Sequence, residues 1–451
     1  MNLNTVKHIY FLGIGGIGMS ALARYFNFEG KAIAGYDRSP SPLTDQLQAE
    51  GIQIHFTESI DLIPKETELV VYTPAIPSDN KELIHFQNSG ITMLKRSEIL
   101  GEISKNYFTI AIAGTHGKTT ITSMIAHILK HNNIAVDAFI GGIANNFESN
   151  LVLSKDAKVM VVEADEFDRS FLSLYPDMAI ISAMDADHLD IYHSAEYLKD
   201  SFFMFTEQIK TGGWLISQSR LDVAPGFRGK LTRYSSTDET DYQATNIHVK
   251  DGKTIFNIKN EHREIPDFNL LMPGSHNVEN ATAAIIACAA YGLEMDQIKK
   301  GLSSYLGVKR RFEFLIREDS LIMIDDYAHH PEEIKASIQA VRSLFPHNKV
   351  TAVFQPHLFS RTRDFMGDFA QSLSAVDELI LLDIYPAREK PIKGITSDYL
   401  LEKINLGKKH LWSKEELVQK IDQLEIEVLI MMGAGDIDRL LQAVKEKLLN
   451  K

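Results

Sequence analysis

A glycine-punctuated segment, AIAGTHGKTT at residues 111–120, has the composition of a phosphate-binding turn. It follows an apolar run and precedes a helical pattern, so N–H groups of the turn and of the helix N-terminus can bind phosphate oxygens. Lys118 would reach the transferable phosphate of ATP, and the Thr119 hydroxyl would bind Mg²⁺. The standard spacing would place a glycine where Ile112 stands. We therefore expect the turn to begin at Gly114.

A second glycine-rich segment, GIGGIG at residues 13–18, fits the Gly-x-Gly-x-x-Gly pattern of a dinucleotide-binding loop. Asp37 lies 19 residues after Gly18 and ends the next predicted strand, where an acidic residue can bind a sugar hydroxyl. Its ligand could be a dinucleotide cofactor such as NAD or a nucleotide-linked substrate. Two such loops favour an enzyme that handles two phosphorylated ligands, one of which is ATP.

Acidic residues follow two further predicted strands. Ligands lie at the carboxyl ends of parallel strands, so both clusters could face the phosphate loop. Carboxylate oxygens suit Mg²⁺, and we expect one or two of these residues to be ligands while the others are solvated. The clusters are Glu163, Asp165, Glu166 and Asp168, and Asp185, Asp187, His188 and Asp190.

The segment IDDYAHHPEEI at residues 324–334 places Asp325, Asp326, Tyr327, His329 and His330 at a predicted strand end, before a helix that starts at Pro331. Adjacent histidines rarely bind one metal, and the chain has no matching set of cysteines and histidines. We therefore expect polar contacts with a substrate rather than zinc.

The segment FQPHLFSRTRDF at residues 354–365 places His357, Arg361 and Arg363 after another predicted strand. Arginine there suits a carboxylate or phosphate bound through two hydrogen bonds. For Arg363, an exposed position on a helix is an equal alternative.

These residues must be positioned by alternating strands and helices. Three α/β series predict parallel sheets, and the period-two segment YQATNIHVKDGKTIFNIKN predicts a hairpin at an antiparallel edge of the second sheet. Domain boundaries are expected near residues 105 and 308. Strands are predicted at 8–13, 31–37, 52–56, 68–73, 107–114, 158–165, 178–185, 321–326, 349–354, 377–383 and 427–433, and helices at 18–30 and 276–293.

The composition narrows the class of protein. The length of 451 residues predicts two to four domains, and a formal net charge of −13 argues against a nucleic-acid partner. Cys288 is the one cysteine, which excludes a disulfide within the chain, and its context predicts a packed apolar position. No signal-peptide layout or membrane-spanning run is present, so we expect a soluble cytoplasmic protein without membrane insertion; the oligomeric state is left undefined.

The motifs also resemble those of a known family. GIGGIGMS, GTHGKTT, EADE, DADHLD, GSHNVENATAA, RRFE, DDYAHHP, QPH with SRTR, and GAGDI occur in this order. Together they resemble the ATP-dependent Mur ligases of peptidoglycan synthesis over essentially the whole chain. GIGGIGMS and DDYAHHP are most similar to members that join L-alanine to UDP-N-acetylmuramate. One departure is Leu358, because related alanine ligases often have arginine after QPH.

The resemblance implies three domains: a Rossmann-like UDP-substrate domain (1–105), a central P-loop ATPase-type domain (106–308) and a C-terminal Rossmann-like domain (309–451). ATP would phosphorylate the muramic-acid carboxylate, and the amine of L-alanine would attack the acyl phosphate. Closure of the domains on ATP binding is expected.

The resemblance also implies a role for each matched residue. Catalytic roles fall on Lys118, His188, His329 and Arg361. ATP contacts fall on Gly114, Thr115, His116, Gly117, Lys118, Thr119, Thr120, His276, Asn277, Arg311 and Asp326. Contacts with the UDP substrate fall on Gly15, Gly16, Ile17, Gly18, Asp37 and the segment Thr73–Ile76, Ala75 included, while Tyr327, His329 and Arg361 orient the two substrates. Thr119 and Glu163 would bind one Mg²⁺, and His188 would serve a second that bridges the γ-phosphate and the substrate carboxylate.

Three alternatives stay open. An NAD-dependent oxidoreductase would explain GIGGIG but not GTHGKTT, and a P-loop switch would explain only the second loop. A ligase that adds a murein tripeptide to the same sugar nucleotide shares the ATP chemistry and differs in the amine.

Overall fold

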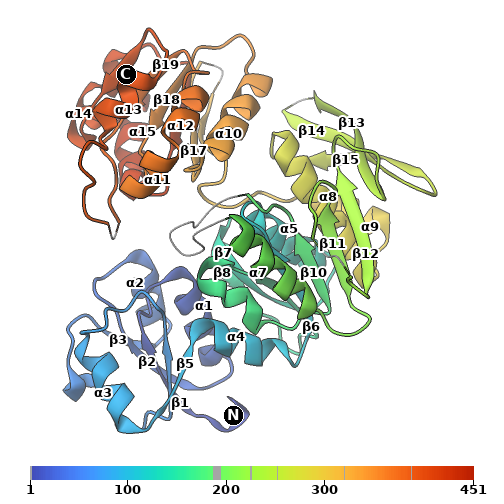
Figure 1. Cartoon of the computed structure of the whole chain (residues 1–451), viewed down its shortest axis with the longest axis vertical. Coiled ribbons are helices and arrows are strands. Elements are labelled where there is room, and N and C mark those ends of the chain that lie inside the picture. Colours follow the sequence, from blue (N-terminus) through green and yellow to red (C-terminus); the bar gives the residue numbers. More distant parts are fainter. Residues whose placement is uncertain are drawn as a thin grey trace. The chain divides into compact units, whose positions relative to one another are not determined.

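The computed structural model describes residues 3–185, 195–223, 226–250, 252–318, 320–387 and 389–450, without the side chains of Phe167, Asp168 and Ala195. The chain forms three β-sheets in sequence order, coloured blue, green to yellow, and orange to red in Figure 1. They belong to two compact units. The first unit comprises Met1–Asn246, Phe256–Asn269 and Glu279–Leu306, and the second comprises Ile247–Ile255, Leu270–Val278 and Gly307–Lys451.

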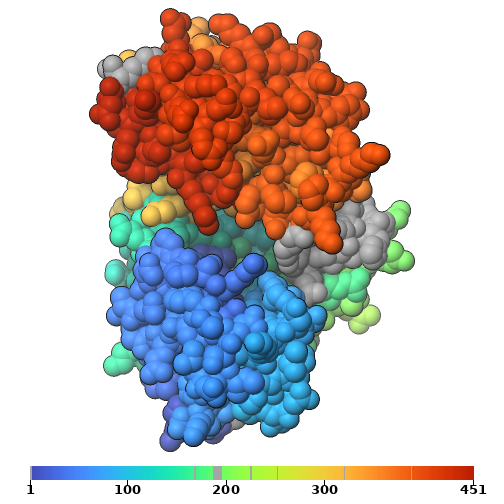
Figure 2. All heavy atoms as spheres, turned by 90° about the vertical axis from the view of Figure 1, so that its left-hand side faces the viewer, coloured from blue at the N-terminus to red at the C-terminus, as the bar shows by residue number. Residues whose placement is uncertain are grey.

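The first sheet has five parallel strands in the order β3-β2-β1-β4-β5. The strands predicted in this part are confirmed: β1, β2 and β4 are buried along most of their length, as parallel strands inside a sheet require, whereas β3 at the edge is partly exposed. Figure 2 shows the outer surface that the side chains of this part (blue) form. The strands are β1 (His8–Leu12), β2 (Ala32–Tyr36), β3 (Gln53–His55), β4 (Leu69–Tyr72) and β5 (Thr92–Lys95), and the helices are α1 (Ile17–Phe28), α2 (Pro42–Ala49), α3 (Lys81–Ser89) and α4 (Arg96–Ser104).

The second sheet has ten strands in the order β15-β14-β13-β12-β11-β10-β6-β9-β7-β8. The predicted hairpin is β13 and β14, and it lies toward one edge of the sheet as expected. The strands are β6 (Phe108–Ala113), β7 (Val136–Ala144), β8 (Ser149–Val152), β9 (Val159–Glu163), β10 (Met178–Ile181), β11 (Trp214–Gln218), β12 (Lys230–Ser235), β13 (Tyr242–Lys250), β14 (Lys253–Asn260) and β15 (Glu264–Leu270).

Four α-helices accompany the second sheet within the described residues. Cys288 is buried in the longest of them, as predicted. The helices are α5 (Lys118–His131), α7 (Ala195–Glu207), α8 (Ser275–Tyr291) and α9 (Met295–Ser303), with a 3-10 helix at Phe167–Ser173. Among the described residues, no helix combines the length and apolar character needed to cross a membrane.

The third sheet has six strands in the order β16-β17-β21-β18-β19-β20, and only β16 runs antiparallel to its neighbour. The parallel strands place the ends of β17, β18 and β19 at one edge of the sheet. The strands are β16 (Glu313–Arg317), β17 (Ile322–Asp326), β18 (Val350–Phe354), β19 (Glu378–Leu381), β20 (Lys409–Leu411) and β21 (Val428–Met432), and the helices are α10 (Pro331–Leu344), α11 (Phe359–Asp364), α12 (Met366–Leu373), α13 (Ser397–Lys403), α14 (Lys414–Lys420) and α15 (Leu441–Leu449).

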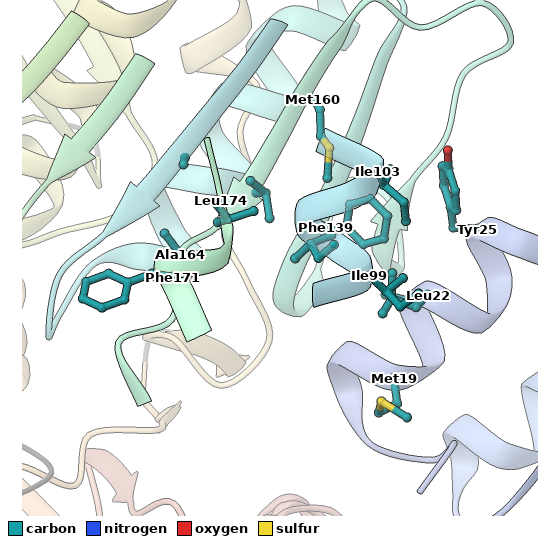
Figure 3. Packing of buried hydrophobic residues seen from close by; sticks show 14 of the residues in the cluster. Met19, Leu22, Tyr25, Ile99, Ile103, Phe139, Met160, Ala164, Phe171 and Leu174 are labelled. Carbon is teal, nitrogen blue, oxygen red and sulfur yellow. The ribbon is translucent and has the colours of Figure 1, made fainter. Parts of the chain in front are cut away.

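A continuous apolar core joins the first sheet's helices to the second sheet. Leu22 of α1 and Ile99 of α4 belong to the same buried cluster as Phe139 of β7, and Figure 3 shows these side chains together. Gly101 of α4 is buried against the segment that carries Ser173. A Cβ atom there would run into the carbonyl oxygen of Ser173, so the close approach requires glycine.

We expect Gly101→Val to lower the free energy of unfolding of the first unit by about 1–3 kcal/mol, because a buried side chain added to a packed contact forces the backbone apart. Urea unfolding monitored by circular dichroism would measure this. Gly367→Ala in α12 is the matched control, since its Cβ meets nothing within 4 Å and alanine suits a helix. Equal stability of both variants would contradict the expectation.

Candidate active site

The phosphate loop joins β6 to α5, and its glycines are required by the backbone. Gly114 has φ +135° and Gly117 has φ +84°, conformations that favour glycine. A side chain at Gly117 would meet the Oδ1 atom of Asn280 in α8. Asn280 was not singled out from the sequence, although it lies within the quoted GSHNVENATAA segment. Glycine is thus required where the loop turns and where it approaches α8.

The end of β10 supports the same loop. The Ser182 hydroxyl hydrogen-bonds to the carbonyl oxygen of His116, and the N–H of Thr115 donates to Ala183 O over 3.1 Å. The His116 ring lies 3.3 Å from the Asp185 carboxylate. These contacts fix the turn before α5 begins at Lys118, so the N–H groups of the first helical turn are oriented in advance for an anion.

Lys118 forms a buried ion pair with Glu166. Its Nζ atom lies 2.8 Å from both carboxylate oxygens and also donates to Gly114 O over 2.8 Å. Burial alone would lower the pKa of Lys118, but Glu166, Asp165 and the neighbouring Glu163 hold that pKa above its ordinary value. The lysine is therefore positively charged at neutral pH at the start of α5, where a phosphate needs it.

Two predicted magnesium ligands are in contact. The Thr119 hydroxyl hydrogen-bonds to Glu163, and Glu163 Oε1 accepts the N–H of Gly141 over 2.6 Å. Burial raises the pKa of Glu163, although the N–H of Gly141 and the charge of Lys118 favour the ionised carboxylate and act to lower that pKa. A hydroxyl and a carboxylate are oxygen donors of the kind that Mg²⁺ prefers, so these residues fit the ion. Asp187, His188 and Asp190, and the side chain of Asp168, lie outside the described residues.

The first glycine loop follows β1 and leads into α1. Gly13 has φ +85°, and a Cβ there would meet Thr73 and Ile76, so part of the predicted Thr73–Ile76 segment lies against the loop. Asp37 Oδ2 accepts the N–H of Gly15 over 2.7 Å. The sequence predicted a ligand contact for Asp37, and the structure shows that this carboxylate also holds the loop itself. Gly16, Ile17 and Gly18 form the start of α1, where N–H groups can bind a diphosphate.

Two residues that sequence reasoning missed hold the first glycine loop against the part of the chain that forms the second sheet. The Arg96 guanidinium packs against Gly18 and lies 3.7 Å from Asp165, in the acidic segment near the phosphate loop. Asn150 of β8 is fully buried and donates to Ile17 O over 2.5 Å. Both nucleotide loops therefore belong to one packed unit. No sequence signal pointed to Arg96, because the strand that precedes it, β5, was not predicted.

In the second unit, the residues after β17 form an arginine and aromatic cluster. Tyr327 lies beneath the guanidinium groups of Arg310 and Arg311, at 5.1 and 5.0 Å from its ring centre. Burial raises the pKa of Asp325 to about 7, against the opposing charge of Arg310, and raises the pKa of Asp326 to about 6. Arg311, Asp326 and Tyr327 are thus brought together, while their predicted roles toward ATP and substrate stay predictions.

A row of rings continues along the same edge of the third sheet. His329 lies 5.1 Å from Tyr327 and 6.1 Å from His357, between ring centres, and His357 stacks on Tyr385 at 5.7 Å. His330 is instead buried against Phe365. Predicted substrate residues of two separate motifs are therefore adjacent in space.

Other predicted contacts have defined local surroundings. Asn277 is buried in the first turn of α8 and donates to Pro273 O over 2.7 Å, and the His276 ring lies against Gly274. Arg361 is half-buried on α11, whereas Arg363 is exposed and paired with Asp364 at 2.7 Å. Of the two alternatives for Arg363, its position supports an exposed arginine on a helix rather than a ligand contact.

His127 on α5 provides a test of how the phosphate-loop helix is anchored. Its Nε2 atom lies 2.9 Å from the Ser304 hydroxyl, and burial, with a contribution from His131, lowers its pKa from 6.5 to about 4. Between pH 6.5 and about pH 4, His127 therefore binds a proton in the unfolded state but stays neutral in the folded state. Stability should fall as the pH drops from 6.5 toward 4, by at most about 1.4 kcal/mol per pH unit.

Urea unfolding at pH 7.5 and pH 5.5 would measure this loss, which His127→Gln should reduce. His347→Gln, at an exposed histidine, is the control and should keep the wild-type dependence. The raised pKa values of Asp325 and Asp326 act in the opposite direction but are common to all three proteins, so they cancel in the comparison. An identical loss in His127→Gln and wild type would exclude His127 as its source.

Two glycine loops at the carboxyl edges of parallel sheets, one followed by a buried lysine and a hydroxyl residue, define a three-domain α/β enzyme of the nucleotide-binding class. Comparison with known families agrees: residues 8–108 match the model of the Mur ligase family catalytic domain, residues 112–288 the Mur ligase middle domain and residues 310–435 the Mur ligase glutamate ligase domain. The chain belongs to the Mur ligase family.

Relatives that resemble this chain over nearly its full length carry one function in their names. UDP-N-acetylmuramate–L-alanine ligase of Parabacteroides distasonis is 47% identical, over 99% of this chain and 98% of that protein. The enzyme of the same name from Flavobacterium psychrophilum is 48% identical, over 99% of each chain. Among solved structures, UDP-N-acetylmuramate-alanine ligase of Thermotoga maritima has a TM-score of 0.85 at 26% identity, over 99% of each chain. A murein peptide ligase from Psychrobacter arcticus shares the fold, with a TM-score of 0.74 at 24% identity and 99% coverage of each chain.

Proposed function

We propose that this protein is an ATP-dependent ligase that joins L-alanine to the carboxylate of UDP-N-acetylmuramate, giving ADP and phosphate, in peptidoglycan synthesis in the cytoplasm. The observation that carries the proposal is the packing of two different nucleotide loops into one unit, with the charged Lys118 in the second. One loop suits the diphosphate of a sugar nucleotide and the other suits ATP. The full-length similarity to alanine ligases supports the choice of amine.

The reaction proceeds in two steps. A carboxylate oxygen of the muramic acid forms a bond to the γ-phosphorus of ATP, and the bond to the leaving ADP breaks. The unprotonated amine of L-alanine then attacks the acyl carbon, phosphate leaves with the bonding electron pair, and the nitrogen loses a proton. The protein forms no covalent bond, so its work is to position the reactants and to neutralise charge.

Lys118 has the central role in the first step, because a negatively charged carboxylate must approach a triphosphate. Its ammonium group, which is hydrogen-bonded to the Glu166 carboxylate, can shift to phosphate oxygens as ATP binds. N–H groups at the start of α5 bind the same phosphates. Mg²⁺ held by Thr119 and Glu163 would neutralise further phosphate charge. His188 is proposed for a second magnesium ion on the strength of its motif.

The second unit is proposed to supply the remaining contacts. Arg311 and Asp326 would reach ATP, and His276 and Asn277 would contact adenine. The adjacent Tyr327 and His329 would orient the substrates, with Arg361 binding the alanine carboxylate. For Tyr327 and His329 this proposal rests on their grouping at one edge of the third sheet, and for the other residues it rests on the family motif positions.

Phosphate release should be measured with ATP, Mg²⁺ and UDP-N-acetylmuramate, with and without L-alanine. We expect release to require both the sugar nucleotide and L-alanine. Release that ignores L-alanine but follows the murein tripeptide would assign the chain to tripeptide ligation instead. Release that needs no amine would favour a P-loop switch, and NADH oxidation without phosphate release would indicate an oxidoreductase.

A further inference from the structure

Two loops of the second unit pair beyond the ends of neighbouring strands. β18 and β19 are parallel, and after them Tyr385 N donates to Pro356 O over 2.8 Å while Leu358 N donates to Tyr385 O over 2.9 Å. His357 and Tyr385 form an isolated parallel bridge, and their rings stack at an interplanar angle of 20°. The segment that leads into α11 is therefore fixed by the loop after β19.

That segment holds a strained residue. Leu358 has φ +71° and ψ +135°, in the left-handed half of backbone space that a branched side chain rarely adopts. Such a conformation persists only where surrounding contacts impose it. Leu358 directly precedes α11, which carries Arg361. The direction in which α11 starts therefore depends on the contacts that hold this turn.

Glu389 contacts Ser360, the residue directly before Arg361. Its Oε2 atom accepts the N–H of Ser360 over 3.0 Å, and its Oε1 atom accepts the Ser360 hydroxyl. The backbone of Glu389 is itself fixed, because its N–H donates to Pro386 O over 2.8 Å. Glu389 thus binds the residue before Arg361 at two points. Both are hydrogen bonds to a carboxylate, which are stronger than hydrogen bonds between neutral groups.

We infer that Glu389 is a positioning residue for amino-acid binding: it fixes the first turn of α11 so that Arg361 meets the carboxylate of the incoming amino acid. The inference rests on the proposed function, in which Arg361 binds that carboxylate. Tyr385 and Glu389, which follow β19, thereby become determinants of amino-acid affinity although neither side chain needs to touch the amino acid.

Glu389→Ala should raise the KM for L-alanine by about ten- to a hundredfold, because a displacement of about 1 Å in a binding group has effects of that size. The KM values for ATP and UDP-N-acetylmuramate should stay near those of the wild type. Glu389→Gln retains an oxygen acceptor and an amide donor for Ser360, so it should restore much of the affinity. Steady-state phosphate release with each substrate varied in turn measures all three KM values.

Glu402→Ala, at an exposed glutamate of α13, is the matched control and should leave every KM unchanged. Thermal unfolding of each variant shows whether the unit stays folded. If the three KM values rise together, or if the KM for L-alanine does not change, the inference is wrong. If wild-type release does not depend on L-alanine, the proposed function fails on its own, and the comparison is repeated with the amine that restores release; an unchanged KM for that amine overturns the inference separately.

Discussion

Lys118→Ala should lower kcat for phosphate release by about 10³-fold, the largest effect that we expect from one substitution. The lysine is the charged group of the phosphate loop, and its ammonium lies 2.8 Å from Gly114 O and from Glu166. Without it, the carboxylate of the substrate would approach the γ-phosphate with less neutralising charge. The KM for UDP-N-acetylmuramate should change little, because the first glycine loop is intact.

The same substitution also leaves Glu166 as a buried carboxylate without its lysine, which destabilises a protein by about 3–5 kcal/mol. Burial already raises the pKa of Glu166, and Lys118 opposes that rise. The double variant Lys118→Ala, Glu166→Gln removes both charges and should recover stability while kcat stays low. Thermal unfolding and phosphate release on the two variants separate the effects. Recovery of kcat together with stability would show that Lys118 acts only through the fold.

Much of the fold follows from local sequence signals. Strands such as β10 and β21 are continuous apolar runs that are buried on both faces, which identifies parallel strands without knowledge of their neighbours. Gly114 and Gly117 were recognisable from the glycine pattern of a phosphate-binding turn, and the structure shows the positive φ values that favour glycine at both positions. Several strands were not predicted. Among them, β5 and β20 are short edge strands with half-buried residues, so their sequences carry no strong period.

The contacts that complete the site depend on tertiary structure. Asn150 reaches Ile17 across 133 residues, and Lys118 reaches Glu166 across 48. Nothing in the local sequence around Asn150 distinguishes a buried contact from an exposed loop position. Glu166 was expected to be a metal ligand or a solvated acid, yet it is the partner of Lys118, for which we propose a catalytic role. Motif spacing identifies residues that share a strand end, whereas side-chain pairing is decided only after the strands are ordered.

Glu163→Gln is expected to have the second largest effect, a fall in kcat of about 10²-fold with a marked rise in the Mg²⁺ concentration needed for half-maximal activity. Glutamine retains an oxygen that can accept the N–H of Gly141, now bound at 2.6 Å, so the local structure should persist. It loses the negative charge that makes the site attractive to a divalent cation. Because Thr119 touches the same carboxylate, the two ligands should act together on one ion.

A magnesium titration of phosphate release would measure the shift, and binding of Mn²⁺ in the presence of ATP would report ligand loss independently of turnover. Thr119→Ala should shift both titrations in the same direction, and the double variant should show less than the product of the single effects, because both side chains serve one ion. Glu68→Gln, at an exposed glutamate that directly precedes β4, is the control. Unchanged Mn²⁺ binding in Glu163→Gln would move the ligand role to another carboxylate, with the kcat loss then assigned to the charge balance around Lys118.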